Sequence, residues 1–475
     1  MTGFVPTGDW KDLESKLALY GQSHLLTFRD RLDELQRAEL LQDIDSLDLF
    51  HLSEYAKQHH RQDFNDLLEQ ATSPLAIRWG QCDLGFSRGQ AYERGMAALR
   101  NGEVGVILVA GGQGTRLAYE DPKGTFPIGP ISGSTLFRIH IEKLRAMTAR
   151  HGRSLPLYLM TSPATTRKIL EDFRRNGNYG LPRHDLRIFE QPTMPAMDAA
   201  TGQILLDQPF LVALSPNGHG GLLEALQRSE TLEEAKYRGI HHFFYFQVDN
   251  PLVSIADPAF IGAHLLSRSE YTLQVVRKLT PRDRVGNVVR NGGRNYIVEY
   301  SDMPNEAAER RDTESGELKF RDGSIAVHAF SLEFLERVCT TVTLPYHVAH
   351  KKVPYVDLNT GEIVKPEKPN AIKFERFIFD ILPEARRSIV VEVDPAEGFA
   401  PLKNASDPNH PDLIDTPEKV RAAMIVQHTR WLRAAGVRVA DGTPVEISPL
   451  YALDAAELQS KVAPGTTIEN PTYLH

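Results

Sequence analysis

The stretch that decides the fold is residues 106–129, VILVAGGQGTRLAYEDPKGTFPIG. It opens with an uninterrupted apolar run, the pattern of a strand buried on both faces of a parallel sheet. The run ends in a glycine-rich turn, where we expect the backbone to adopt positive φ and a ligand to approach the main chain closely. Arg116 and Lys123 follow, and both side chains can contact phosphate oxygens. The pattern predicts a polyphosphate site at a strand end.

Two familiar phosphate-binding motifs are excluded by spacing. A dinucleotide fingerprint needs glycines at positions i, i+2 and i+5, but the third position counted from Gly112 is Leu117. A P-loop needs Gly-Lys followed by Ser or Thr, and that tripeptide does not follow this strand. The loop therefore represents a different kind of phosphate site.

Further apolar runs lie at residues 155–162, 186–191 and 241–250, and helical patterns such as residues 134–150 separate them. Strands that alternate with helices predict an α/β fold with a doubly wound, mostly parallel, Rossmann-like sheet. In such sheets the ligand binds beyond the carboxyl ends of the strands. Later apolar segments are joined by hairpin-like turns, such as residues 290–295, and predict an added antiparallel portion.

The chain has 475 residues, which is too long for one compact core. Apolar residues recur at intervals of three, four or seven within residues 1–95, and this spacing predicts a helical N-terminal region. Residues 96–385, which contain the glycine-rich loop and the alternating strands and helices, are expected to form one central domain. Residues 386–475 are richer in Pro, Asp and Asn, and we expect a small C-terminal mixed domain there.

Composition excludes several functional classes. The net charge is −8 without a long Lys/Arg block, which argues against nucleic acid or an anionic membrane as the main partner. The two cysteines, Cys82 and Cys339, form neither a disulfide framework nor a zinc site. The sequence shows no apolar signal core and no window of about 18 apolar residues. We therefore expect a soluble, cytoplasmic protein.

The loop sequence LVAGGQGTRL, followed by PKG, resembles the signature loop of the UDP-N-acetylglucosamine and UDP-sugar pyrophosphorylase family. Other matching segments continue in family order and include FEQPTMPAM, NGHGGLLEAL, VDNPLVSIADPAFIG, KPNAIKFERFIFD and PLKNASD. The resemblance implies a nucleotidyltransferase sheet and a uridylyltransferase activity. It also implies that residues 96–385 form the catalytic domain that binds nucleotide and sugar. Its substrates would be UTP and a sugar 1-phosphate, and its products a UDP-sugar and pyrophosphate.

The resemblance also implies roles for residues at matching positions. The residues that it assigns to nucleotide binding are Gly111, Gly112, Gly114, Gln191 and Lys373. The residues that it assigns to catalysis on the phosphates are Arg116, Lys123 and Lys403. The residues that it assigns to sugar binding are Gly218, His219, Gly286, Glu299, Tyr300 and Ser324.

Two assignments, those of Asp249 and Gln191, rest on clear chemistry. Asp249 follows a strongly apolar run, and a carboxylate at the end of a buried strand needs a partner. The resemblance implies Mg²⁺, which usually takes one or two carboxylates together with substrate phosphates. Gln191 matches the residue that contacts uracil, and a primary amide can donate to and accept from the imide edge.

The identity of the sugar stays open. His219 and Ser324 stand where the N-acetylglucosamine enzymes usually carry Asn, and a His at residue 219 is more typical of the UDP-glucose and broad-specificity branches. The match over KPNAIKFERFIFD and HVAHKKVPYVD favours N-acetylglucosamine 1-phosphate. A distant alternative is a non-catalytic nucleotide-sugar-binding protein. Such a protein could lose Asp249 or Lys403 without penalty, yet both are present.

Overall fold

The computed structural model describes residues 10–57, 64–80, 85–463 and 465–475, so Cys82 lies outside the described residues. The chain forms two compact units, each assembled from separate segments. The larger, here called the sheet unit, consists of residues 64–190, 223–342 and 379–475. The other, here called the smaller unit, consists of residues 1–63, 191–222 and 343–378. No helix in the described part of the chain combines the length and hydropathy that a membrane span needs.

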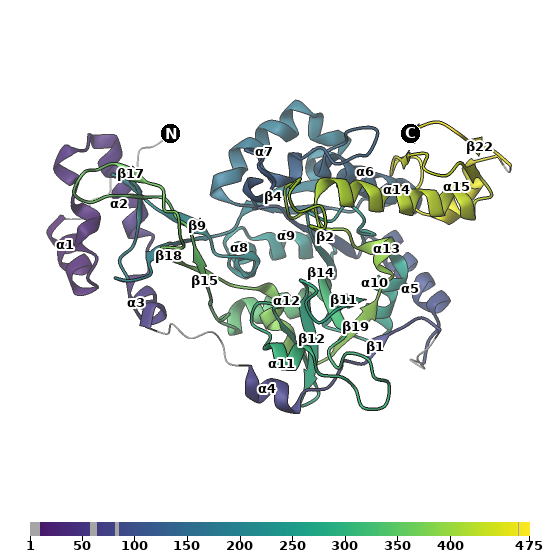
Figure 1. The fold of residues 1–475 in the computed structure, drawn as a ribbon, viewed down its shortest axis with the longest axis horizontal. Coiled ribbons are helices and arrows are strands. Elements are labelled where there is room, and N and C mark those ends of the chain that lie inside the picture. Colours follow the sequence, from purple (N-terminus) through teal and green to yellow (C-terminus); the bar gives the residue numbers. More distant parts are fainter. Residues whose placement is uncertain (1–9, 58–63, 81–84, 464) are drawn as a thin grey trace. The chain divides into compact units, whose positions relative to one another are not determined.

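The sheet unit contains the largest sheet in the described chain, with ten strands (Figure 1). The sheet has the order β1, β19, β11, β14, β10, β2, β3, β4. These strands are β1 (Ala76–Ile77), β2 (Val104–Val109), β3 (Leu157–Thr161), β4 (Leu186–Glu190), β10 (His242–Gln247), β11 (Tyr271–Arg277), β14 (Asp322–Ser331) and β19 (Ser388–Glu392). Neighbours are parallel except where β14 pairs with β10 and β11. The predicted α/β fold with a central, mostly parallel sheet is confirmed.

The predicted antiparallel portion is also confirmed. Strands β12 (Gly286–Asn291) and β13 (Arg294–Val298) form a hairpin, and β12 continues onto β14. The turn between them places Gly292 at φ 55° and Gly293 at φ 82°. Side chains disfavour this left-handed region, so the Gly-Gly pair suits a tight hairpin turn.

Helix α6 (Leu136–His151) covers part of the sheet with an apolar face that includes the fully buried Phe137, Ile141 and Leu144. The Thr135 side chain caps its start by accepting from the Arg138 amide, and Gly152 at φ 71° ends it. Phe137 packs edge-on against Phe173 of α7 (Pro163–Arg175). This burial anchors the helix, so its polar residues keep fixed positions.

Helices α5 (Arg88–Asn101) and α10 (Pro258–Leu266) approach each other so closely that side chains do not fit between them. A Cβ atom on Gly262 would lie 1.6 Å from the Ala91 carbonyl oxygen, and one on Gly95 would lie 1.9 Å from that of Pro258. The other α-helices after residue 64 are α4 (Asn65–Gln70), α8 (Leu222–Arg228), α9 (Thr231–Tyr237), α11 (Asn305–Ala308), α12 (Leu332–Thr341), α13 (Pro395–Gly398), α14 (Pro417–Ala434) and α15 (Ala455–Lys461).

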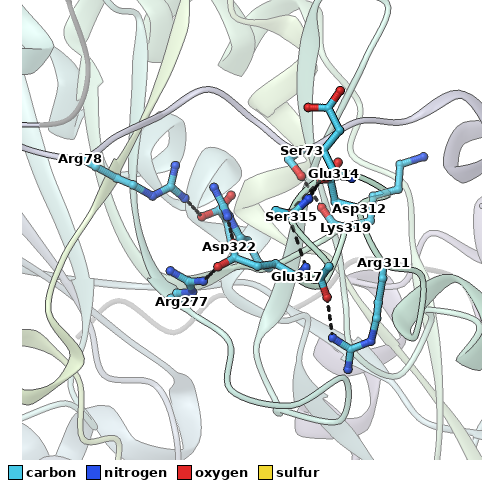
Figure 2. A network of polar contacts seen from close by, with 12 residues as sticks. Ser73, Arg78, Arg277, Arg311, Asp312, Glu314, Ser315, Glu317, Lys319 and Asp322 are labelled. Atoms are coloured by element: carbon cyan, nitrogen blue, oxygen red, sulfur yellow. Dashed lines mark hydrogen bonds and ion pairs between the residues drawn. The ribbon is translucent and has the colours of Figure 1, made fainter.

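A polar network fixes the start of β14 (Figure 2). The guanidinium of Arg78 lies 2.8 Å from the buried carboxylate of Asp322 and 2.5 Å from that of Glu392. Burial raises the pKa of Asp322 to about 6, and the charge of Arg78 opposes this shift. Glu317 pairs with Arg277 and Arg321 nearby. These contacts position β14, which carries Ser324 two residues after Asp322.

The smaller unit combines N-terminal helices with short strands. The predicted helical pattern is confirmed for α1 (Trp10–Leu19), α2 (Glu34–Asp45) and α3 (Leu49–Lys57). A three-stranded antiparallel sheet joins β6 (Met197–Asp198), β18 (Ala371–Glu375) and β15 (His347–Lys351). One apolar cluster includes Leu40 and Ile44 of α2, Met197 of β6 and Phe374 of β18. This shared core explains why three distant segments form one unit.

Candidate active site

The glycine-rich loop follows β2 and is closed by hydrogen bonds across its base. The Lys123 backbone amide donates to the Gly112 carbonyl at 3.2 Å, and the Gly114 backbone amide donates to the Asp121 carbonyl at 3.2 Å. The Ser162 hydroxyl donates to the Gly111 carbonyl at 2.8 Å. These contacts fold residues 111–123 back on themselves beside the strand end.

The expected positive φ is wrong for this loop. Gly111, Gly112 and Gly114 are absent from the described glycines with positive φ, and Gly114 has φ −78°. Close packing accounts for Gly114, because a Cβ there would lie 2.7 Å from the Tyr119 carbonyl oxygen. A Cβ on Gly112 would meet no atom within 4 Å. The missing side chain at Gly112 therefore leaves open space beside the backbone, where a ligand can approach.

Four predicted charged residues gather in the sheet unit. The Lys123 ammonium lies 3.6 Å from the Asp249 carboxylate. The Asp249 carbonyl accepts from the Leu402 amide at 2.8 Å. The Arg116 carbonyl accepts from the Ala405 amide at 2.9 Å. The segment that carries Lys403 therefore runs past both Asp249 and Arg116, although these positions are far apart in the sequence.

Asp415 is a further member of this cluster that the sequence patterns did not indicate. Its carbonyl accepts from the amides of Lys403 and Asn404, at 2.8 and 3.1 Å. Burial raises the pKa of the Asp415 carboxyl. The positive charge of Lys403 lowers this pKa, and the negative charge of Asp249 raises it further. Asp415 has φ 62°, and Asp is among the few residues that tolerate this region. Nothing in its local sequence distinguishes it from an ordinary turn residue.

The predicted sugar residues of the sheet unit also lie together. Gly286 pairs with Ser324 across β12 and β14. A Cβ on Gly286 would lie 2.6 Å from Ile297 and 3.6 Å from the Glu299 carboxylate. Tyr300 is exposed and lines a cavity of about 140 Å³. The structure thus brings Gly286, Glu299 and Ser324 to one place, with Tyr300 next in the chain.

The smaller unit holds the remaining predicted residues. Gln191 is buried, and its side-chain oxygen has no hydrogen-bond partner among the described residues. A buried amide oxygen without a partner carries an energetic cost that a ligand could relieve. Lys373 lies in β18 opposite Ala349, and burial lowers the pKa of its ammonium. Burial disfavours the charged form of this lysine, and an anion bound nearby would favour it.

His219 is held in a defined orientation. Its Nδ1 atom accepts from the Ile378 amide at 3.2 Å, and its ring stacks on Phe377 with centroids 5.2 Å apart. Burial lowers the pKa of His219 to about 4, so the imidazole is neutral near pH 7. Since Nδ1 accepts, Nε2 carries the proton. Gly218 at φ 80° lets the chain pass the Arg376 carbonyl, which a Cβ would approach to 2.5 Å.

Residues 90–462 match the family described as UTP–glucose-1-phosphate uridylyltransferase. The chain belongs to this family. It is 37% identical over 451 residues to the UDP-N-acetylhexosamine pyrophosphorylase-like protein 1 of Xenopus tropicalis, covering 90% of this chain and 86% of the relative. It is 34% identical over 450 residues to the UDP-N-acetylglucosamine pyrophosphorylase of Saccharomyces cerevisiae, covering 93% and 91% of the two chains. The resemblance seen in the sequence is confirmed.

Solved structures agree with this family. The uridine diphosphate N-acetylglucosamine pyrophosphorylase of Trypanosoma brucei, in complex with an inhibitor, superposes with a TM-score of 0.79 at 25% identity and covers 99% of both chains. The UDP-glucose phosphorylase of the same organism has a TM-score of 0.59 at 15% identity and covers 97% of this chain and 98% of its own. The second similarity, at lower identity, shows a shared fold.

Proposed function

We propose that the protein transfers the uridylyl group of UTP to a sugar 1-phosphate, with N-acetylglucosamine 1-phosphate as the main sugar substrate. The observation that carries this proposal is the gathering of Arg116, Lys123, Asp249 and Lys403 at the carboxyl ends of parallel strands in a member of this family. The named acetylglucosamine relatives support the choice of sugar.

The chemistry requires charge neutralisation rather than a strong base. An oxygen of the sugar phosphate forms a bond to the α-phosphorus of UTP, the bond to the bridging oxygen breaks, and pyrophosphate leaves. The nucleophile is already anionic, so positioning and electrostatic stabilisation carry the rate. We assign Lys403 to the reacting α-phosphate. We assign Arg116 and Lys123 to the other phosphate oxygens, since the open space at Gly112 leaves the backbone beside them accessible.

The residues present suit Mg²⁺. Asp249 supplies a hard carboxylate oxygen at a strand end, and Asp415 is near enough for the Asp249 charge to raise its pKa. No group of three potential metal-ligating side chains occurs among the described residues. That fits an ion held largely by substrate phosphates, as Mg²⁺ usually is. When bound, the ion would offset phosphate charge. Asp249 would hold it, and Lys123 would balance the carboxylate.

We propose recognition roles for the other predicted residues. Gln191 contacts the uracil edge, and its buried oxygen without a protein partner supports that role. Lys373 contacts a phosphate. His219 faces the sugar, where its neutral Nε2–H can donate to a hydroxyl or carbonyl oxygen. The other residues that we assign to sugar binding are Gly218, Gly286, Glu299, Tyr300 and Ser324.

The alternative sugar is glucose 1-phosphate, or a range of sugars. His219 favours this alternative because it replaces the usual Asn. We also propose the finer domain division at residues 1–95, 96–385 and 386–475, within a doubly wound, Rossmann-like fold. A separate apolar cluster that includes Leu432, Val445 and Leu458 supports a small C-terminal domain.

Pyrophosphate release by the purified protein tests the proposal. The assay combines UTP and Mg²⁺ with N-acetylglucosamine, N-acetylgalactosamine, glucose or galactose 1-phosphate. We expect the highest kcat/KM with N-acetylglucosamine 1-phosphate. A higher value with glucose 1-phosphate would establish the alternative. Absence of pyrophosphate with every sugar, together with tight UTP binding, would establish the non-catalytic binder instead.

A further inference from the structure

Helix α6 sends two side chains, one turn apart, to the backbone on either side of Asp249. The His140 Nε2 atom donates to the Val248 carbonyl at 2.9 Å. The Lys143 ammonium donates to the carbonyls of Pro251 and Val253, at 2.5 and 2.8 Å. Three carbonyls around one carboxylate are thus held by a single buried helix.

These carbonyls lie just beyond β10, where the sheet no longer satisfies the backbone. The strand ends at Gln247, and residues 248–256 form turns without regular structure. Buried carbonyl groups need donors. The two side chains supply them, and they fix the direction in which the chain leaves the strand.

His140 is fully buried and Lys143 is partly buried, and placing polar donors at such positions is costly, which points to a specific role. His140 is fully buried against Phe246, and burial lowers the pKa of its imidazole to about 3. Burial also lowers the pKa of Lys143, which makes no ion pair with any residue that the structure describes. Apolar residues at these helix positions would stabilise the core more simply. The carbonyl contacts explain why polar groups stand there instead.

Residues 398–402 also contact the chain around Asp249. The Asn250 side-chain amide donates to the Gly398 carbonyl at 2.7 Å and accepts from the Ala400 backbone amide at 3.1 Å. The Leu402 backbone amide donates to the Asp249 carbonyl. Residues 248–253 are therefore held both by α6 and by the segment that leads to Lys403. A shift on either side would move the carboxylate relative to that lysine.

We propose that His140 and Lys143 are positioning residues, which act through the backbone of residues 248–253 to hold the Asp249 carboxylate where it binds the metal with UTP. The proposal rests on the proposed function. Partners one step removed from a metal ligand typically change metal affinity by about 10- to 100-fold when they are lost. Neither residue needs to touch substrate, so their effect is expected on the metal and on kcat.

The experiment compares Lys143→Met, Lys143→Arg, His140→Leu and His140→Gln with the unaltered protein. Arg145→Met is the matched control, because it removes a long cation on α6 that donates to the Tyr179 carbonyl instead. Binding of Mn²⁺ to the protein with UTP, followed by electron paramagnetic resonance, gives a readout independent of turnover. The Mg²⁺ dependence of pyrophosphate release and the KM for sugar 1-phosphate are measured for each variant as well.

We expect Lys143→Met and His140→Leu to weaken Mn²⁺ binding by roughly 10-fold or more and to raise the half-saturating Mg²⁺ equally. The KM for sugar 1-phosphate should change by less than about twofold. Lys143→Arg and His140→Gln retain an N–H donor, so they should recover most of the affinity. Arg145→Met should bind Mn²⁺ normally.

Unchanged Mn²⁺ affinity in both disruptive variants would overturn the proposal, even if the variants melted at lower temperature. If Lys143→Met fails to fold, the His140 pair decides the question. An inactive unaltered protein that still binds Mn²⁺ with UTP would refute the proposed function alone, because the positioning effect would remain measurable by the binding readout.

Discussion

The Lys123 ammonium and the Asp249 carboxylate lie 3.6 Å apart, beside the ends of two neighbouring parallel strands. Each side chain is largely enclosed, with 18% and 13% of its surface exposed, so the charges interact more strongly than a surface pair would. The carboxylate therefore has two expected functions: it holds the metal, and it orients a lysine toward phosphate.

Asp249→Asn removes the charge but keeps the shape of the side chain. We expect kcat to fall by roughly 10²- to 10³-fold, the usual scale for losing one preorganised electrostatic group. The melting temperature should change little. Asp441→Asn is the control, since Asp441 is fully exposed. Measuring activity against Mg²⁺ concentration checks the result, and an unaltered Mg²⁺ dependence would place the metal elsewhere.

Lys403→Ala should lower kcat by roughly 10²- to 10³-fold while UTP affinity falls less, because the lysine is assigned to the reacting phosphate. The exposed Lys419 of α14 serves for comparison, and Lys419→Ala should be neutral. Steady-state kinetics with both substrates separate the two effects. Near-normal kcat in Lys403→Ala would show that this lysine is an ordinary surface residue.

Gln191 predicts the nucleotide preference. Uracil offers an imide that a primary amide can match, whereas adenine lacks one. We expect UTP to be strongly preferred to ATP, and Gln191→Ala to reduce kcat/KM for UTP by roughly 5-fold, since one hydrogen bond is worth about 1 kcal/mol. Equal rates with UTP and ATP in the unaltered protein would contradict the assignment to uracil.

His219 predicts the sugar preference. Its imidazole is larger than the usual Asn side chain, and its position is fixed by Ile378 and Phe377. It should crowd an acetamido group while still bonding a hydroxyl. His219→Asn should raise kcat/KM for N-acetylglucosamine 1-phosphate relative to glucose 1-phosphate by several-fold, or about 1 kcal/mol.

The sugar comparison is best made with four proteins: the unaltered chain, His219→Asn, Ser324→Asn and the double variant. Both sugar 1-phosphates are tested at saturating UTP. The effects of two residues that bind the same ligand need not add, so the double variant shows whether the full shift requires both changes. A constant ratio across all four proteins would mean that residue 219 does not distinguish the substituent at C2.

Buried histidines predict loss of stability in acid. Burial lowers the pKa of His140 to about 3, and of His219 and His428 to about 4. Their native pKa values lie below the unfolded value near 6.5, so the unfolded state takes up protons first. The contribution of these histidines to the free energy of unfolding is fully present above about pH 6.5 and is lost as pH falls toward 4. At pH 5, each histidine should lower the free energy of unfolding by about 2 kcal/mol.

Asp322 partly offsets this loss, because its native pKa of about 6 lies above the unfolded value and its protonation favours the folded state. Urea unfolding at pH 7.5 and pH 5 measures the difference in the free energy of unfolding. His428→Gln should reduce that difference by about 2 kcal/mol. His184→Gln, which replaces an exposed histidine, provides the comparison.

The sequence by itself determined the strands, the position of the glycine-rich loop and the family. Apolar runs such as the one before Gly111 predict buried strands because side-chain periodicity follows local backbone geometry. The glycine and charged residues of the loop lie within a short stretch, so their association needs no knowledge of distant parts. The same local logic located the Gly292–Gly293 hairpin, where positive φ is required.

Only the tertiary structure decided which distant residues meet. The sequence does not indicate that residues 191–222 and 343–378 share a core with the N-terminal helices, because that unit forms by long-range strand pairing and apolar packing. Asp415 and the pair His140 and Lys143 were missed for the same reason: their partners are backbone groups far along the chain. Such contacts leave no periodic pattern in the sequence, since a single correctly placed donor or acceptor is enough to make the hydrogen bond.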